Sequence, residues 1–111
     1  MYRPATMREP TYFVLAALLD GPLHGYGITQ RAHELSGGRV RLSAGTLYGA
    51  LERLAAEGLV EQDAEEVVGG RRRRYHRLTG AGERAVAEEA ERLAAAASVV
   101  AQRLRARTVT A

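Results

Sequence analysis

Residues 42 to 59 read LSAGTLYGALERLAAEGL, and this stretch decides the fold. It predicts one short helix with two defined ends. Ser43 can serve as the N-cap, because its hydroxyl can accept a bond from an otherwise unpaired backbone N–H of the first turn. Gly58 stands where a left-handed residue ends a helix, and Leu59 can fold back onto Leu54 as in a Schellman motif.

The two faces of this predicted helix differ in chemistry. One face is an apolar stripe at i, i+4 and i+7, made of Leu47, Leu51 and Leu54. The other face is small or hydroxyl-bearing, made of Ala44, Gly45, Thr46, Tyr48 and Gly49. Small side chains permit close approach, and hydroxyls can bond phosphate oxygens or base edges. Two interpretations stay open from this stretch alone: a helix that enters a DNA groove, and a helix packed by its small face against another helix.

The composition limits the classes of protein. A chain of 111 residues suits one domain with one modest core. No apolar run is long enough to span a bilayer and the N-terminus is no signal peptide, so we expect no membrane association and a cytoplasmic location. The absence of cysteine excludes disulfides and thiolate metal sites. The three histidines are scattered, and no nucleophile with a base, phosphate loop or dinucleotide motif is present, so we expect no metal, no cofactor and no enzyme activity.

The N-terminal half predicts a helix-turn-helix layout. Residues 1–9 are expected to form a flexible arm, and Pro10 suits a first helical turn. Residues 11–20 are apolar nearly all round, so we expect a helix buried on more than one side, in part by a second subunit. A second helix over residues 24–36 and a short strand over residues 40–42 then precede the helix quoted above, which takes the recognition position.

The next segment predicts a wing. We expect a strand over residues 59–62, a loop over residues 63–70 that ends in two glycines, and a returning strand over residues 71–78. The run Arg71 to Arg74 is the strongest electrostatic signal, and at a wing tip several of its side chains could reach phosphates or a minor groove. The alternative is a solvated edge strand blunted by charge. The preceding helix-turn-helix pattern favours nucleic acid.

The last segment predicts a helix over residues 80–107, about 40 Å long, with Thr79 as its N-cap and residues 108–111 as a frayed tail. Its apolar residues are spaced 4, 3, 4, 3, 4 and form a coiled-coil seam of Val86, Ala90, Leu93, Ala97, Val100 and Leu104. A small body cannot cover so long a helix, so we expect a two-fold homodimer rather than a solvated helix. The first helix would add Phe13, Leu15 and Leu19 to the interface.

The residues predicted to contact DNA are Tyr26, Ser43, Ala44, Gly45, Thr46, Tyr48, Arg71, Arg72 and Arg73. For Tyr48 the alternative is partial burial against the wing, and for Tyr26 it is a place in the core. The predicted core is Phe13, Leu18, Ile28, Leu35, Leu47, Leu51, Leu54 and Leu78.

Three stretches carry a family resemblance. PTYFVLAALLDGPLHGYGI, LSAGTLYGALERLAAEGLV and GGRRRRYHRLTGAGERA resemble the PadR family of bacterial transcriptional regulators, over residues 7–85. The resemblance implies a winged helix-turn-helix domain, a homodimer through the last and first helices, and repression at a near-palindromic operator. It also implies a response to a small phenolic or lipophilic ligand. Gly49 stands where the family often has Pro, Tyr75-His76 replaces an aromatic pair, and the chain lacks the tryptophan that lines some family drug sites.

These observations predict a mainly α protein with a small β wing: a winged helix-turn-helix domain over residues 10–78 and a dimerisation helix over residues 79–107. We expect a homodimeric regulator that binds double-stranded DNA and represses its own or a neighbouring promoter. The alternative is a winged-helix module whose basic wing binds an acidic protein partner.

Overall fold

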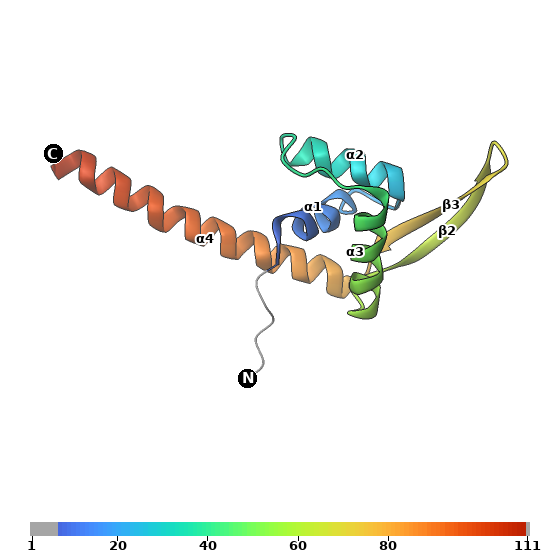
Figure 1. Cartoon of the computed structure of the whole chain (residues 1–111). Helices are drawn as coiled ribbons and strands as arrows, with labels where there is room; N and C mark the ends of the chain where they lie inside the picture. Colours follow the sequence, from blue (N-terminus) through green and yellow to red (C-terminus); the bar gives the residue numbers. More distant parts are fainter. Residues whose placement is uncertain (1–6, 111) are drawn as a thin grey trace.

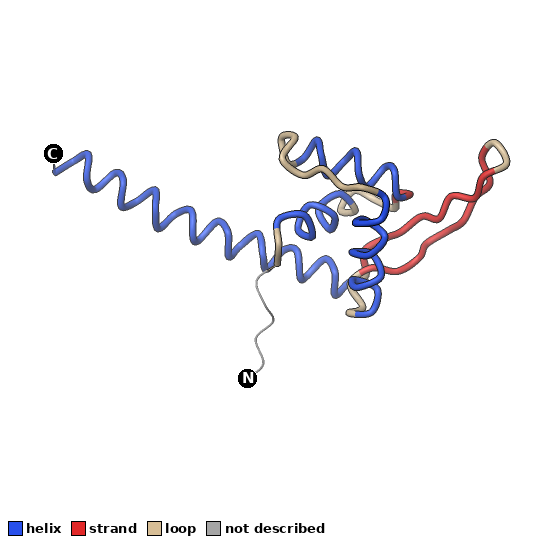
Figure 2. The backbone as a smooth tube through the Cα atoms, viewed as in Figure 1, coloured by secondary structure: helices blue, strands red, loops and turns tan. Residues whose placement is uncertain are grey.

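A computed structural model describes residues 7–110 of the chain. Its elements, in order, are α1 (Glu9–Ala17), β1 (Leu23–His24), α2 (Gly25–Leu35), α3 (Ala44–Ala56), β2 (Val60–Val68), β3 (Arg71–Leu78) and α4 (Gly80–Thr110). The three strands form one antiparallel sheet in the order β1-β3-β2. Helices α1 to α3 gather into a body, from which the β2–β3 hairpin projects in one direction and α4 in the other (Figures 1 and 2). This is the predicted winged helix-turn-helix with a long C-terminal helix.

Helix α3 has the predicted ends. The Ser43 hydroxyl accepts a hydrogen bond from the backbone N–H of Thr46 at 3.2 Å. Gly58 has φ of +75° and the Leu59 N–H donates to the Leu54 carbonyl at 2.9 Å, which is the Schellman pattern. Both ends are fixed by contacts within a few residues.

The core lies where α1, α2, α3 and the base of the sheet meet, and α4 adds one side chain. Its buried residues are Val14, Leu15, Ala17, Leu18, Ile28, Leu47, Leu51, Leu54, Val60 and Val86. Of the predicted core, Leu78 packs partly buried against this cluster and Phe13 is half-buried. Leu35 is a correction: it is the last residue of α2 and is 43% exposed, because the chain turns away just after it.

The first half differs from the prediction in several places, beginning with α1, which starts at Glu9 inside the predicted arm. Residues 40–42 form no strand; they are an extended link, anchored where the Val40 N–H donates to the Ser36 hydroxyl at 2.9 Å. The strand that joins the sheet is β1, immediately before α2. Helix α1 ends at Ala17 rather than at residue 20, because the chain enters a turn that leads to Gly21 at φ of +140°. Residues 1–6 of the predicted arm lie outside the described residues.

The wing is longer than predicted. Strand β2 continues to Val68, so the connection is only Gly69-Gly70, with φ of +58° and +78°. Such a two-residue turn matches the right-handed twist of a hairpin and requires positive φ at both positions. Of the residues expected in a loop, Glu65 to Val68 are therefore paired with β3, and Asp63 and Ala64 lie at an irregularity in the register between Gln62 and Glu65.

Helix α4 starts at a close junction. The Thr79 hydroxyl accepts from the Gly82 N–H at 3.0 Å and donates to the Gly58 carbonyl at 2.6 Å, as expected of an N-cap that also joins two elements. The helix continues to Thr110 rather than fraying after Arg107. No residue from Glu91 to Val109 is buried. Within residues 7–110, no helix has the length and apolar character needed to cross a bilayer.

Candidate nucleic-acid interface

The predicted DNA-contacting residues gather at one end of the molecule. Helices α2 and α3 both begin on the side from which the hairpin projects, opposite the free end of α4 (Figure 1). On α3 the exposed residues at this end are Ser43, Ala44, Gly45, Thr46 and Tyr48. A small, hydroxyl-bearing helix start and a charged wing are thus presented together.

The two hydroxyls at the start of α3, those of Ser43 and Thr46, are hydrogen-bonded to each other. The Ser43 hydroxyl lies 2.9 Å from the Thr46 hydroxyl and also caps the Thr46 N–H. When Ser43 donates to Thr46, the Thr46 hydroxyl keeps its own proton for an outside acceptor. Phosphate oxygens and base edges are acceptors of this kind.

Both tyrosines are exposed, so a core position for Tyr26 is wrong, and Tyr48 is partly covered where its ring lies over Gly25 of α2. Tyr48 is 53% exposed and Tyr26 is 68% exposed. The Tyr48 hydroxyl lies close over Gly25, where a Cβ atom would come within 3.0 Å of it. The Tyr26 hydroxyl accepts from Gln30 Nε2 at 3.1 Å, a contact that no motif in the sequence indicates.

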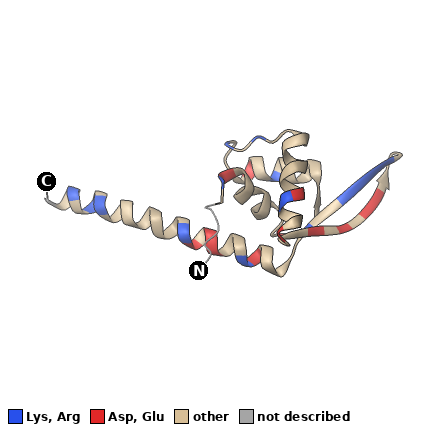
Figure 3. Cartoon of the chain, turned by 60° about the horizontal axis from the view of Figure 1, so that its bottom comes forward, with Lys and Arg blue, Asp and Glu red and all other residues tan. Residues whose placement is uncertain are grey.

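The wing carries both signs of charge. Arg71 to Arg74 lie opposite the stretch from Val68 back to Glu65, and Figure 3 shows basic β3 beside acidic β2. Arg72 pairs with Glu65 at 3.3 Å, and the Glu66 carboxylate accepts from the Tyr75 hydroxyl at 3.0 Å. The basic charge is therefore partly neutralised within the hairpin itself. The arginines of β3 were not predicted from the sequence to lie opposite the glutamates of β2, although a Gly-Gly pair is a known signal for a two-residue hairpin turn.

The base of the wing is held by other groups. Arg77 pairs with Glu61 at 2.8 Å and with Asp63 at 2.7 Å. The hydrogen bonds that Arg77 donates to these two carboxylates raise the pKa of Arg77 above its ordinary value. Arg77 is thus engaged in fixing the hairpin and is less available to a ligand than the arginines at the tip.

The histidines have structural positions. His24 Nδ1 accepts from the Gly27 N–H at 3.2 Å and caps α2. His76 pairs with Leu23 of β1 in the sheet, and its buried Nε2 has no hydrogen-bond partner among the described residues. Burial, and secondarily the charge of Arg74, lowers the pKa of His76 below 6.5. Among the described residues, no group of histidine and carboxylate side chains could hold a metal ion.

The predicted dimer residues divide into two groups. Leu15 and Val86 are 0% and 4% exposed within one chain, so their inclusion in an interface is wrong: they face the chain's own core. The exposed residues are Leu19, Ala90, Leu93, Ala97, Val100 and Leu104. Phe13 is half-buried beside a hollow of about 310 Å³ between α1 and α4, lined also by Met7, Glu9, Tyr12, Glu89 and Leu93.

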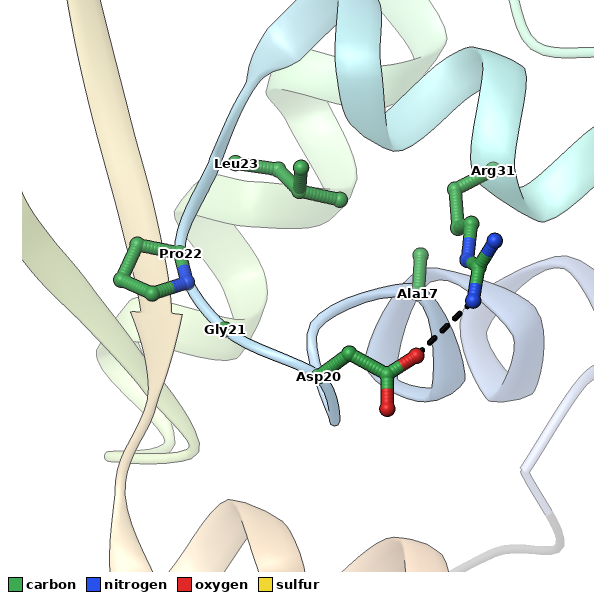
Figure 4. A pocket seen from close by; sticks show the side chains of 6 residues that line it. All are labelled: Ala17, Asp20, Gly21, Pro22, Leu23 and Arg31. Atoms are coloured by element: carbon green, nitrogen blue, oxygen red, sulfur yellow. Dashed lines mark hydrogen bonds and ion pairs between the residues drawn. The ribbon is translucent and has the colours of Figure 1, made fainter.

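A second hollow, of about 240 Å³, lies between the end of α1 and α2 (Figure 4). The Arg31–Asp20 ion pair, at 2.8 Å, crosses it (Figure 4). None of the predicted DNA contacts lines this hollow.

Comparison with known proteins gives consistent matches. The model of the transcriptional regulator PadR-like family matches residues 14–88. The transcriptional regulator Rv3488 of Mycobacterium tuberculosis is 43% identical over 76 residues, which are 68% of this chain and 67% of that protein. An uncharacterised 37.1 kDa protein in transposon TN4556 of Streptomyces fradiae is 47% identical over 81 residues, which are 73% of this chain but only 22% of that protein.

Among solved structures, Bacillus subtilis PadR in complex with operator DNA superposes with a TM-score of 0.64 at 26% identity. The match covers 73% of this chain and 46% of that one. This chain therefore spans about a fifth of the transposon relative and about half of the Bacillus protein. The residues matched by the family model, 14–88, include the exposed face of α3 and the wing.

Proposed function

The chain belongs to the PadR-like family of transcriptional regulators, and from that premise we propose that it is a homodimeric repressor that binds a near-palindromic operator in duplex DNA. The family and its relatives are regulators rather than enzymes. We assign DNA binding to residues 10–78 and dimerisation to residues 79–107.

One observation carries the proposal: the exposed hydroxyl face of α3 and the arginines of the wing lie at the same end of the body. A helix of this kind fits the major groove, where Thr46 and Tyr48 reach base edges and Ser43 reaches the backbone. Arg71 to Arg73 then lie where a wing reaches phosphates or the adjacent minor groove. The Bacillus neighbour, solved with operator DNA, supports this use of the fold.

Dimerisation is supported by the free half of α4. Leu93, Val100 and Leu104 are 41%, 58% and 54% exposed, and they continue the stripe by which Val86 packs into the body. Burying each such side chain contributes roughly 1.5–3 kcal/mol, which favours association. The hollow between α1 and α4 opens beside Leu93, so a partner helix or a small lipophilic or phenolic effector would enter it there. An effector bound there would act on repression by changing how the two subunits pack.

The recognition experiment uses Thr46→Ala and Tyr48→Ala, with Thr108→Ala near the far end of α4 as the matched control. Each α3 substitution should cost roughly 1–3 kcal/mol on an operator selected from a random duplex pool, with little change on random DNA. Fluorescence anisotropy at fixed salt measures both affinities, and circular dichroism checks the fold. If both variants bind the operator like wild type, the assignment of α3 is refuted.

The dimer experiment places charges on the seam. Leu93→Glu with Val100→Glu should give monomers at micromolar concentration in analytical ultracentrifugation, because unpaired charges are costly to bury. Val99→Glu is the matched control: Val99 is exposed to a similar extent, at 56%, but lies off the predicted seam. A wild-type protein that sediments as a monomer would refute the architecture and, with it, the palindromic operator.

A further inference from the structure

The outer half of the wing has no packing against the body to fix its direction. Every residue from Glu61 to Arg74 is exposed. The β2–β3 register is interrupted between Gln62 and Glu65, and bulges of this kind bend and twist a hairpin. Side chains that reach across this irregularity can therefore add to the backbone ladder in setting the direction of the outer half, which carries the predicted phosphate contacts.

One pair of side chains does so. Tyr75 lies opposite the irregularity, and its hydroxyl donates to Glu66 Oε1, beyond the irregularity, at 3.0 Å. The Tyr75 residue itself is held at the body, because it is half-buried and paired with His24 across β1 and β3. The two rings meet edge to face with centroids 5.4 Å apart. Since His24 also caps α2, one connected set of contacts runs from the start of α2 to the outer wing.

We propose that the Tyr75–Glu66 hydrogen bond braces the outer wing at the angle to α2 and α3 that its arginines need to meet DNA. The inference rests on the proposed function and assigns two positioning residues to it. Glu66 pairs directly opposite Arg73 in the ladder, so the brace acts close to the arginines that it positions.

Charge alone gives the opposite expectation for Glu66. A carboxylate among phosphate-binding arginines repels DNA, so its removal should strengthen binding. A brace instead requires an acceptor at this position, which Glu66→Gln keeps and Glu66→Ala removes. Comparison of these two variants separates the hydrogen bond from the charge.

The wing offers a matched control. Glu65 is also acidic and adjacent to the arginines, but its partner Arg72 lies on the same, outer side of the irregularity. Loss of this pair removes an interaction within the outer wing without freeing that half from the base. Glu65→Ala should therefore leave the direction of the wing unchanged.

The experiment measures hydrogen exchange of the paired amides of residues 65–74 in the DNA-free protein, by mass spectrometry or NMR. Tyr75→Phe and Glu66→Ala should accelerate this exchange several-fold, whereas Glu66→Gln and Glu65→Ala should stay near wild type. Circular dichroism checks the fold. The brace is overturned if Tyr75→Phe exchanges like wild type, or if Glu66→Gln exchanges as fast as Glu66→Ala.

The binding arm uses the same variants on operator and random duplexes over a range of salt. Tyr75→Phe should weaken operator binding about tenfold, as expected for one lost hydrogen bond, and should lower the slope of log K against log salt because fewer phosphates are reached. Glu66→Gln should bind random DNA at least as tightly as wild type. Altered exchange with unchanged affinity would overturn the role in DNA binding. A wild-type chain that binds no duplex would refute the proposed function, and exchange would then decide the brace separately.

Discussion

Replacing Gly82 by alanine should destabilise the protein more than any other single methyl addition at its glycines. Gly82 is buried in the first turn of α4, against the backbone where α3 gives way to β2. A Cβ atom there would overlap the carbonyl oxygen of Leu59 and lie 3.0 Å from both the Leu59 carbonyl carbon and Leu78 Cδ2. The obstacle is backbone, so it cannot rotate away as a flexible side chain would.

The expected magnitude follows from what must move. Relief of the overlap requires a displacement of α4 on the order of 1 Å, and overpacking of this kind costs about 1–3 kcal/mol. The same displacement strains the Thr79 N–H bond to Leu59 O at 3.1 Å and the Thr79 hydroxyl bond to Gly58 O, each worth about 1 kcal/mol net. Alanine returns about 1 kcal/mol through its helix propensity. We expect a net loss of roughly 2–4 kcal/mol in the free energy of unfolding.

Urea unfolding followed by circular dichroism measures this loss, at one fixed protein concentration because association would contribute to apparent stability. Gly49→Ala is the matched control. Its Cβ would meet only Arg53 Nη1 at 3.7 Å, in the interior of α3, so it should stabilise by about 0.5–1 kcal/mol. If Gly82→Ala unfolds within about 0.5 kcal/mol of wild type, the argument for a rigid contact with Leu59 is wrong.

Two further predictions concern the wing. The double variant Arg72→Ala with Arg73→Ala should weaken binding to operator and random DNA alike. It should also flatten the slope of log K against log salt, by up to about 0.9 per lost phosphate contact. An unchanged slope would contradict phosphate binding by these arginines. The buried, unpaired His76 has its pKa lowered in the folded state, chiefly by desolvation, so the unfolded chain binds the proton first as the pH falls. The free energy of unfolding should therefore decline as the pH falls below 6.5, and His76→Phe should reduce this decline. Urea titrations between pH 5 and 8 measure the free energy of unfolding of both proteins. An equal decline in the variant would exclude His76 as its source.

The elements fixed by local chemistry were predictable from sequence. Ser43 and Gly58 end α3 through contacts within five residues of themselves, and Thr79 caps α4 through Gly82. The long helix α4 was likewise indicated by the spacing of its apolar residues, whereas the dimer seam along it stays a prediction. In each case the residues that determine the element are its neighbours in sequence.

The features that depend on contacts between residues distant in sequence were not predicted. Strand β1 is two residues long and exists because β3, about fifty residues later, pairs with it. Leu15 and Val86 were expected at a partner's surface, but only the packing of α1 against the body and α4 decides that they face inward. The outer part of β2 is rich in glutamate, which seldom marks a strand, so its pairing with the arginines was not apparent.

In the proposed dimer, the length of the exposed half of α4 sets the distance and the relative orientation of the two DNA-binding bodies. Inserting one residue between the body and the seam would lengthen each subunit's helix by about 1.5 Å and turn each body about 100° about that helix relative to the seam. Seven residues restore the orientation of each body to within about 20°, yet they add about 10.5 Å to each subunit's helix, while the duplex repeats only every 34–36 Å or so. A change in helix length that preserves the orientation of the bodies therefore seldom matches the helical repeat of the DNA. Relatives with a differently spaced operator would be expected to change the crossing of the two helices more readily than their length.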